Sequence, residues 1–155
     1  MQSITFKPIG VIHNTITNPK DAPRSERMAD GITATVEIFP EYADGLSDLE
    51  GFSHVILLVH FHLSKDYDLK TLPFLGHTKR GVFATRSPRR PNPIGMSIVR
   101  LIKIDGNVLK IANTEMVDGT PVLDIKPYVP LPYKREEIKL GWLEEHISDR
   151  DENLP

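Results

Sequence analysis

Short stretches with an apolar residue at every second position recur along this chain, and they constrain its fold more than any other feature. In ITATVEIF (residues 32–39), the isoleucines, alanine and valine fall on one side of an extended chain, and the threonines and glutamate fall on the other. Period-two alternation of this kind predicts a half-buried β-strand. The chain therefore has the sequence pattern of a β-rich protein.

Further strands are predicted at residues 4–13, 54–63, 81–86, 96–104, 108–116 and 121–129. The fourth and fifth of these flank residues 105–107, whose Asp-Gly pair is a strong hairpin signal. HVILLVHFHL (residues 54–63) is apolar on both faces and predicts a central, buried strand. Residues 40–52 suit a short helix, residues 14–31 a long polar loop, and residues 135–147 fit either a helix or a strand.

This pattern predicts a mainly β fold, a single antiparallel barrel that is closed or partly closed, with one or two short helices and long functional loops. No predicted strand is followed by G-x-G-x-x-G and a helix, so no Rossmann domain is expected. We expect residues 1–133 to form the barrel domain and residues 134–155 a C-terminal extension whose last eight residues fray.

Composition points to an ordinary globular protein in a reducing compartment. The 155 residues are 39% hydrophobic and 26% charged, and they include no cysteine. The absence of cysteine excludes disulfide and thiolate chemistry and favours the cytoplasm. The longest apolar run, VILLV, is too short to cross a membrane, and the N-terminus lacks the pattern of a secretory signal.

The charges are segregated along the chain although the net charge is only −2. Residues 69–104 contain no acidic residue but eight lysines and arginines, whereas the segment after residue 133 is mainly acidic. Local field, more than net charge, attracts an anionic ligand. A solvated face balanced by nearby acids is the alternative, which we prefer for the scattered lysines.

ATRSPRRPNPIG (residues 84–95, the arginine loop) combines three prolines with three arginines. Its prolines restrict the loop before binding, so less entropy is lost when a ligand arrives. Arginine forks match carboxylates and phosphates, and Asn92 offers both a donor and an acceptor. The arginine loop is therefore predicted to bind an anionic ligand.

Two further constellations have weaker signals. DGTP (residues 118–121) predicts a turn, and Asp124, Lys126 and Tyr128 share one face of the following strand, as an ordinary polar face also would. His60 and His62 have the same parity on one predicted strand and could reach one zinc or iron ion, although hydrogen-bonded histidines are more common. No nucleophile signature accompanies Ser25.

GVFATRSPRRPNPIGMSIVRL (residues 81–101) and DGTPVLDIKPY (residues 118–128) resemble the TsaA-like family, also called TrmO. GFSHVILLVHFH (residues 51–62) and APRSERMADG (residues 22–31) fit the same pattern in the same order. The resemblance implies an S-adenosylmethionine-dependent β-barrel methyltransferase without a Rossmann domain. It further implies that the substrate is N6 of threonylcarbamoyladenosine beside the anticodon of tRNA, and that the protein is a homodimer with the cofactor near its interface.

Carried over by motif, the resemblance also implies the residues of the site. The cofactor-binding residues would be Pro23, Arg24, Ser25, His62, Leu63, Arg86, Met96, Asp118, Gly119, Thr120 and Pro121. Beside them we expect Arg89, Arg90, Asn92 and Lys126 to bind the substrate, whose carboxylate and phosphates suit guanidinium groups.

Methyl transfer from a sulfonium is an in-line displacement that needs neither a metal nor a covalent intermediate. The lone pair of a carbamoylated N6 is delocalised, so a general base would help, and Asp118, Asp124 and Tyr128 are unranked candidates. Two alternatives stay open: a metal-dependent enzyme built on His60 and His62, and a non-catalytic RNA-binding β-barrel whose arginine loop holds phosphates.

Overall fold

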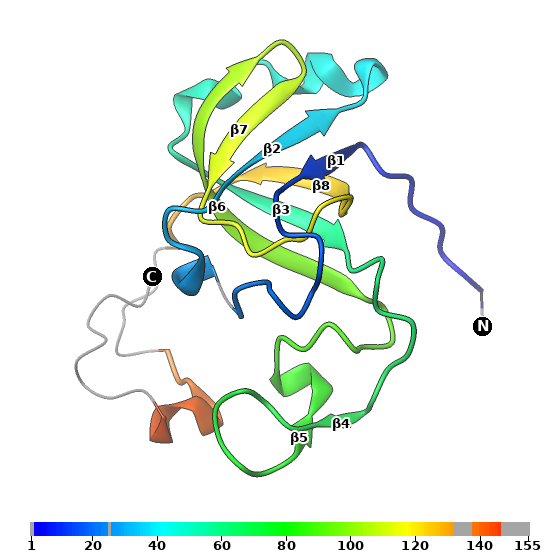
Figure 1. Ribbon diagram of the computed structural model, residues 1–155, viewed down its shortest axis with the longest axis vertical. Helices are drawn as coiled ribbons and strands as arrows, with labels where there is room; N and C mark the ends of the chain where they lie inside the picture. Colours follow the sequence, from blue (N-terminus) through cyan, green and yellow to red (C-terminus); the bar gives the residue numbers. More distant parts are fainter. Residues whose placement is uncertain (1, 25, 132–137, 147–155) are drawn as a thin grey trace.

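Six antiparallel strands close into a barrel in the order β1-β2-β7-β6-β3-β8 (Figure 1). The computed structural model describes residues 2–24, 26–131 and 138–146. The barrel strands are β1 (Gly10–His13), β2 (Thr33–Ile38), β3 (His54–His60), β6 (Ile94–Asp105), β7 (Val108–Ala112) and β8 (Pro121–Pro127). A small separate sheet pairs β4 (Lys70–Thr71) with β5 (Arg80–Gly81). The predicted mainly β fold with a closed barrel is confirmed.

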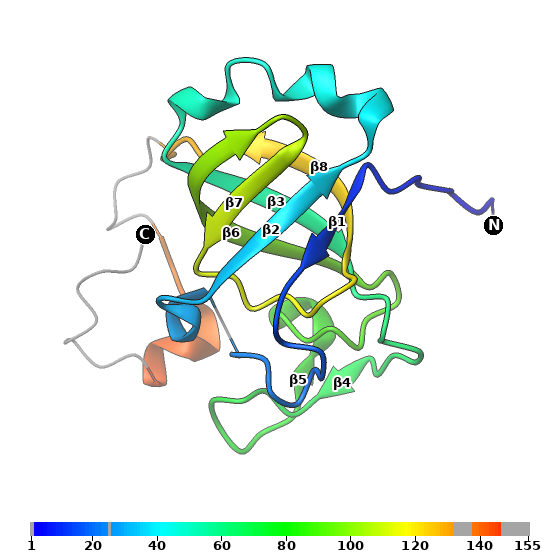
Figure 2. The same ribbon diagram turned by 45° about the horizontal axis from the view of Figure 1, so that its top comes forward.

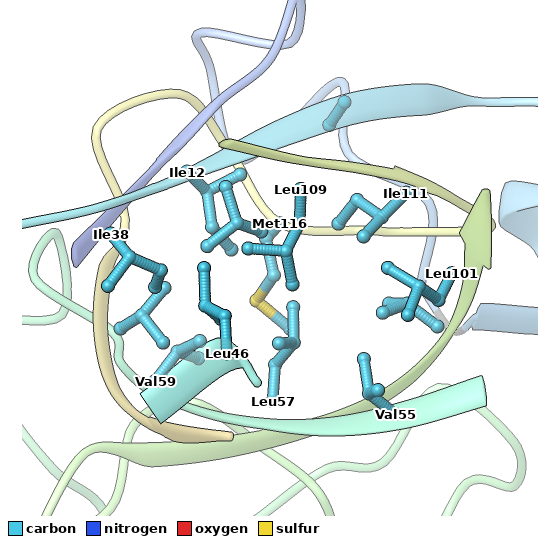
Figure 3. Close-up of a cluster of buried hydrophobic side chains, with 14 residues drawn as sticks. Ile12, Ile38, Leu46, Val55, Leu57, Val59, Leu101, Leu109, Ile111 and Met116 are labelled. Atoms are coloured by element: carbon cyan, nitrogen blue, oxygen red, sulfur yellow. The ribbon is translucent and has the colours of Figure 1, made fainter. Parts of the chain in front are cut away.

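The barrel interior is filled by the inward-facing residues of every strand, as the alternation in the sequence predicts. Val55, Leu57 and Val59 on β3 are fully buried, while the residues between them are only half-buried. Figure 3 shows these side chains interleaved with those of the other strands, and Met116 among them. The barrel is therefore a packed core and not a channel.

Short 3₁₀ helices provide all of the helical structure in the described residues. They are η1 (Glu26–Ala29), η2 (Pro40–Leu46), η3 (Leu49–Gly51), η4 (Val82–Ala84) and η6 (Gly141–Glu145). Figure 2 shows η2 and η3 lying across one end of the barrel, where Leu46 and Leu49 pack against the core. The helix predicted at residues 40–52 is thus two 3₁₀ helices joined at Asp48, which has a left-handed φ of 67°.

Strands end earlier than predicted wherever a proline or a tight turn interrupts their ladder. The strand predicted at residues 4–13 starts only at Gly10, two residues after Pro8, which has no N–H to donate. β7 ends at Ala112 because Asn113 adopts a left-handed φ of 63°. The predicted β6–β7 hairpin is present, with Gly106 at φ 60° in its turn.

Two other boundaries move near the arginine loop. β3 ends at His60, because Pro93, the next partner in the register, has no N–H to donate back to Phe61, and because His62 turns back to donate to His60 O at 2.8 Å. The strand predicted at residues 81–86 is β5 followed by η4, where Thr85 N–H and Oγ1 both donate to Val82 O. These turns redirect the chain at the end of the barrel that is opposite to η2 and η3.

The segment after the barrel is described only in part. A helix or a strand was predicted for residues 135–147, and the described residues 138–146 contain the 3₁₀ helix η6. The last eight residues, which were expected to fray, lie outside the described part. Within the described residues, no helix has both the length and the apolar character needed to span a membrane.

Candidate functional site

Three segments that are distant in sequence meet at the end of the barrel opposite η2 and η3. Phe61 N–H donates to Pro93 O at 2.8 Å, and Ser64 Oγ donates to Pro88 O at 3.0 Å. On the other side, His62 Nε2 lies 3.9 Å from the position that a Cβ on Gly119 would take. The residues after β3 therefore bridge the arginine loop and the turn at residues 118–121.

This aspartyl-glycine turn (residues 118–121) is held to the end of β1 by its backbone. Asp118 N–H donates to Ile16 O at 2.7 Å, and Gly119 N–H donates to Ile12 O at 2.8 Å. Gly119 has a φ of 75°, a left-handed conformation that residues with a Cβ rarely adopt. Thr120 is buried, and its hydroxyl donates to Val117 O at 2.7 Å. The turn is a fixed feature of the fold.

The carboxylate of Asp118 faces β1 and β2. Its Oδ1 accepts the N–H of Asn14 at 3.0 Å and lies 3.9 Å from His13 Nδ1. The same His13 ring contacts Glu37 through Nε2 at 2.9 Å. Asp118 therefore anchors the aspartyl-glycine turn to the barrel wall through its side chain as well as its backbone.

His62 lies between the aspartyl-glycine turn and the arginine loop. Desolvation by partial burial lowers the pKa of His62, and the neighbouring His60 ring lowers it further. An imidazole with a pKa below 6.5 is largely neutral at pH 7 and can accept a proton or a hydrogen bond. Because a neutral ring does not repel a cation, the site is compatible with a sulfonium ligand.

The arginine loop uses part of its own charge to hold its shape. Arg90 Nη1 lies 3.2 Å from both Thr85 O and Ser87 O and donates to them. Arg89 Nε donates to Asp68 Oδ2 at 3.0 Å, in a pair of which about half of each side chain is exposed. Arg90 is therefore a brace inside the loop, while Arg89 sits in a solvent-accessible ion pair.

Close packing fixes the point at which the arginine loop enters β6. The ring of Phe61 and Cγ2 of Val59 lie so close to Gly95 that no Cβ would fit there. The glycine that ends the loop is thus required by the approach of an aromatic ring, and its φ is not in the left-handed region.

The loop at residues 22–31 reaches the β4–β5 segment. The guanidinium carbon of Arg24 lies 4.2 Å from the centre of the Phe74 ring, a cation–π contact. Pro23 is half-buried beside it, and Ser25 lies outside the described residues. Arg86 and Asn92 are exposed on the arginine loop, and Leu63 is exposed after β3.

The remaining predicted residues lie elsewhere. Met96 is on the outer face of β6, opposite Leu58. Lys126 pairs with Asp124 at 2.8 Å on β8, and the Tyr128 ring contacts His54 at the start of β3. His54 and His60 are six residues apart along β3, or about 20 Å. Of the three predicted general bases, only Asp118 lies at the site.

The structure does not have the geometry on which the hypothesis of a metal site at His60 and His62 was based. That hypothesis required His60 and His62 on one face of a continuous strand, but β3 ends at His60 and the chain turns back there. Among the residues that the structure describes, no group of three or more histidine, aspartate or glutamate side chains is arranged to hold a metal ion.

Several supporting residues were missed by the sequence analysis. Trp142 Nε1 on η6 donates to Ala84 O at 2.8 Å, and the Arg80 guanidinium lies 5.6 Å from its ring centre. Trp142, the only tryptophan of the chain, was the one available signal. Asp68, Asn14 and His13 had none, because each acts through a partner that is far away in sequence.

A family profile described as "tRNA-methyltransferase O N-terminal domain" matches residues 11–132. The chain belongs to this family. The family resemblance predicted from the motifs is therefore confirmed, and the matched TrmO domain contains the arginine loop, the aspartyl-glycine turn and His62.

Three relatives illustrate how far this similarity to other TrmO-domain proteins extends. A probable S-adenosyl-L-methionine-binding protein of Pyrococcus abyssi is 51% identical over 93% of this chain and 78% of its own. The tRNA (adenine(37)-N6)-methyltransferase of Escherichia coli is 40% identical over 84% of this chain and 60% of its own. The crystal structure of TrmO from Pseudomonas aeruginosa has a TM-score of 0.75 and 36% identity, covering 90% of this chain and 62% of that one. The chain thus spans less than two thirds of the latter two.

Proposed function

We propose that this protein is an S-adenosylmethionine-dependent methyltransferase that modifies N6 of the adenosine beside the anticodon of tRNA, in its threonylcarbamoylated form. The observation that carries the proposal is the meeting of the arginine loop, His62 and the aspartyl-glycine turn at one end of a TrmO-family barrel. The 40% identity to the Escherichia coli tRNA (adenine(37)-N6)-methyltransferase supports the same reaction. The alternative is a protein that binds tRNA without catalysing methyl transfer, and a methylation assay distinguishes the two functions.

The cofactor would lie against the aspartyl-glycine turn and His62. S-adenosylmethionine supplies the methyl group as a sulfonium electrophile. The turn is rigid because Gly119 and Asp118 donate their backbone N–H groups to β1 and the segment after it. Such a fixed wall lets the protein act mainly by positioning, which contributes about 7–11 kcal/mol in favourable cases. The lowered pKa of His62 keeps positive charge out of this wall.

His62 is a second proton acceptor at the site, beside Asp118. Asp118 already accepts the N–H of Asn14 and anchors the turn, whereas His62 is largely neutral at pH 7. As the methyl group is transferred, the carbamoylated N6 must lose its proton, and a neutral imidazole can take it. We therefore assign the general base to His62 and a positioning role to Asp118.

The arginine loop would hold the anionic parts of the RNA. Its shape is set by the prolines and by Arg90, so little freedom is lost on binding. Arg89 is held near the site by an exposed ion pair that a phosphate or the threonyl carboxylate can replace. Arg86 and Asn92 lie exposed on the same loop.

We further propose that the protein acts in the cytoplasm as a homodimer whose interface covers the site. Large apolar side chains are exposed around the arginine loop and the β4–β5 sheet, and they include Leu63, Leu69, Leu72, Phe74, Phe83 and Ile94. An apolar surface of this kind marks an interaction site. A second copy would shield these side chains and enclose the cofactor.

The deciding experiment supplies S-adenosylmethionine with a labelled methyl group and total tRNA, and then identifies the modified nucleoside by mass spectrometry. We expect label in N6-methylated threonylcarbamoyladenosine, and thermal stabilisation of the protein by the cofactor alone. Stabilisation without transfer to any tRNA would contradict the proposed reaction. No stabilisation and no transfer, with tRNA still bound, would establish the RNA-binding alternative.

His62→Asn and Asp118→Asn test the two assigned roles. His62→Asn should lower kcat at saturating cofactor by about 10²–10⁴-fold. Asp118→Asn keeps an acceptor for the Asn14 N–H and should retain most of the activity. The reverse order of effects would transfer the role of general base to Asp118.

A further inference from the structure

A groove lies at the end of the barrel opposite the proposed active site, between η2–η3 and the strands β1 and β8. This distal groove has a volume of about 610 Å³. Its apolar lining includes Ile9, Ile38, Leu49, Phe52 and Ile125, and its acidic residues are Glu41, Asp48 and Asp124, of which Asp124 is already paired with Lys126. No basic side chain is among the lining residues, so the groove suits an apolar ligand that carries positive charge.

One wall of the distal groove is an incompletely paired strand. β8 pairs with β3 along its length, but β1 pairs with it only at Pro121 and Val122. Within the described residues, β8 has no strand partner on its β1 side from residue 123 onward. There Ile125 N–H donates to Asp124 Oδ1 at 2.9 Å, a local bond that an added strand would have to displace. An unpaired strand edge of this kind can accept an added extended segment.

The chain carries an extended segment of matching chemistry at the mouth of the groove. The N-terminal arm (residues 2–8) precedes Ile9 and runs away from the barrel as an exposed segment outside any strand (Figure 1). Ile4 and Phe6 have the same parity in this arm and are 80% and 63% exposed. Lys7 follows them, and no residue of the arm donates or accepts a hydrogen bond within the described structure.

We propose that the N-terminal arm of a second copy of this chain occupies the distal groove. Ile4 and Phe6, on one face of the extended arm, enter the apolar lining. Lys7 lies on the opposite face, so its charge matches the acidic character of the groove as a whole and not one particular carboxylate. A second copy is favoured over the chain's own arm because residues 2–8 leave their own groove at Ile9 and project outward (Figures 1 and 2). A symmetric pair would exchange both arms. This contact is separate from the interface proposed around the active site.

The absence of cysteine makes a direct cross-linking test possible. Phe6→Cys on the arm and Phe52→Cys in the groove are made as separate single variants, mixed, and oxidised mildly. We expect a disulfide-linked pair that contains one chain of each variant, identified by mass spectrometry. Lys110→Cys, exposed on β7, is the matched control and should give at least tenfold less product with Phe6→Cys.

A chain carrying both Phe6→Cys and Phe52→Cys distinguishes the two sources of the arm. Disulfide formation within single chains, without any product in the mixture of single variants, would mean that each arm folds into its own groove and would overturn the proposal. Product no greater than that of the Lys110→Cys control would overturn it as well. Circular dichroism of each variant establishes that the barrel is folded.

A second measurement does not depend on new cysteines. A fluorescent peptide with the sequence QSITFKPI (residues 2–9) is titrated with a chain that lacks residues 2–8. We expect saturable binding that weakens at least tenfold when serine replaces Ile4 and Phe6 in the peptide. Equal binding of both peptides would show that the apolar side chains do not enter the groove. Methyltransferase activity of the truncated chain is measured separately, so failure of the proposed function would not affect this result.

Discussion

Replacing Gly95 by alanine should destabilise the barrel at the point where the arginine loop enters β6. A Cβ at this position would overlap the Phe61 ring and come within 2.8 Å of Val59 Cγ2. Both neighbours belong to β3 or its end, and Val59 is fully buried, so neither can move freely. Overpacking of this kind costs about 1–3 kcal/mol in the free energy of unfolding. For a chain of this size, each kcal/mol corresponds to about 2–4 °C in Tm.

The assay is thermal and urea unfolding of Gly95→Ala in two backgrounds. In the Phe61→Leu background, the ring atoms that meet the new Cβ are absent, so the same substitution should cost at least 1 kcal/mol less. Gly51→Ala is the matched control, because a Cβ there meets nothing within 4 Å and Gly51 has no left-handed φ. A Gly95→Ala cost that is negligible, or equal in both backgrounds, would refute the steric explanation.

Four further predictions concern the site and the residues that support it. Below pH 6.5 the unfolded chain protonates His62 more readily than the folded chain does, because the pKa of His62 is lowered in the folded state. The contribution of His62 to the free energy of unfolding, present above pH 6.5, should therefore decline as the pH falls toward that lowered pKa. Unfolding titrations at several pH values check this decline, with His62→Asn as the control that cannot titrate. Stabilisation by S-adenosylmethionine should fall over the same pH range, and an equal decline in His62→Asn would contradict the assignment. Trp142→Phe removes the donor to Ala84 O and should cost about 1 kcal/mol of stability by urea unfolding, whereas no loss would show that the bond contributes nothing. Asp68→Asn breaks an exposed ion pair with Arg89 and should change the free energy of unfolding by less than about 1 kcal/mol. Because Arg89 is then released for the RNA, tRNA binding in filter assays should become stronger. Weaker binding would mean that Asp68 positions Arg89.

The barrel could be predicted from the sequence because its signal is local. Alternation in residues 32–39 and the Asp-Gly turn at residues 105–107 each act within a few residues, and both are present in the structure. Strand ends were predicted less well, since they depend on distant partners. β3 ends at His60 because the next partner in its register is Pro93, which has no N–H and lies on another segment, so no local pattern reveals this end.

The candidate site shows the same division. Its motifs were visible because glycine, proline and arginine are unusual in combination, yet their spatial relation was not. His62 and Gly119 come together only because β8 pairs with β3 and brings the aspartyl-glycine turn to the end of that strand. The same pairing carries Tyr128 to the opposite end of the barrel, although it lies only nine residues after Gly119. Tyr128 is close to Gly119 in sequence, but the extended strand between them places the two residues at opposite ends of the barrel. The sequence analysis therefore assigned Tyr128 to the site wrongly.

The arginine loop shows why composition alone could not assign its charges. All three arginines suggested ligand contacts, but Arg90 donates to two carbonyl oxygens of its own loop. A proline-rich segment lacks amides, so its carbonyl oxygens cannot all be satisfied by a backbone ladder, and a guanidinium with several donors is suited to bridge them. The loop thus uses one arginine to hold the conformation that presents the others. Rigidity and charge occur together here because the prolines and Arg90 fix the conformation, and the arginines also supply the charge.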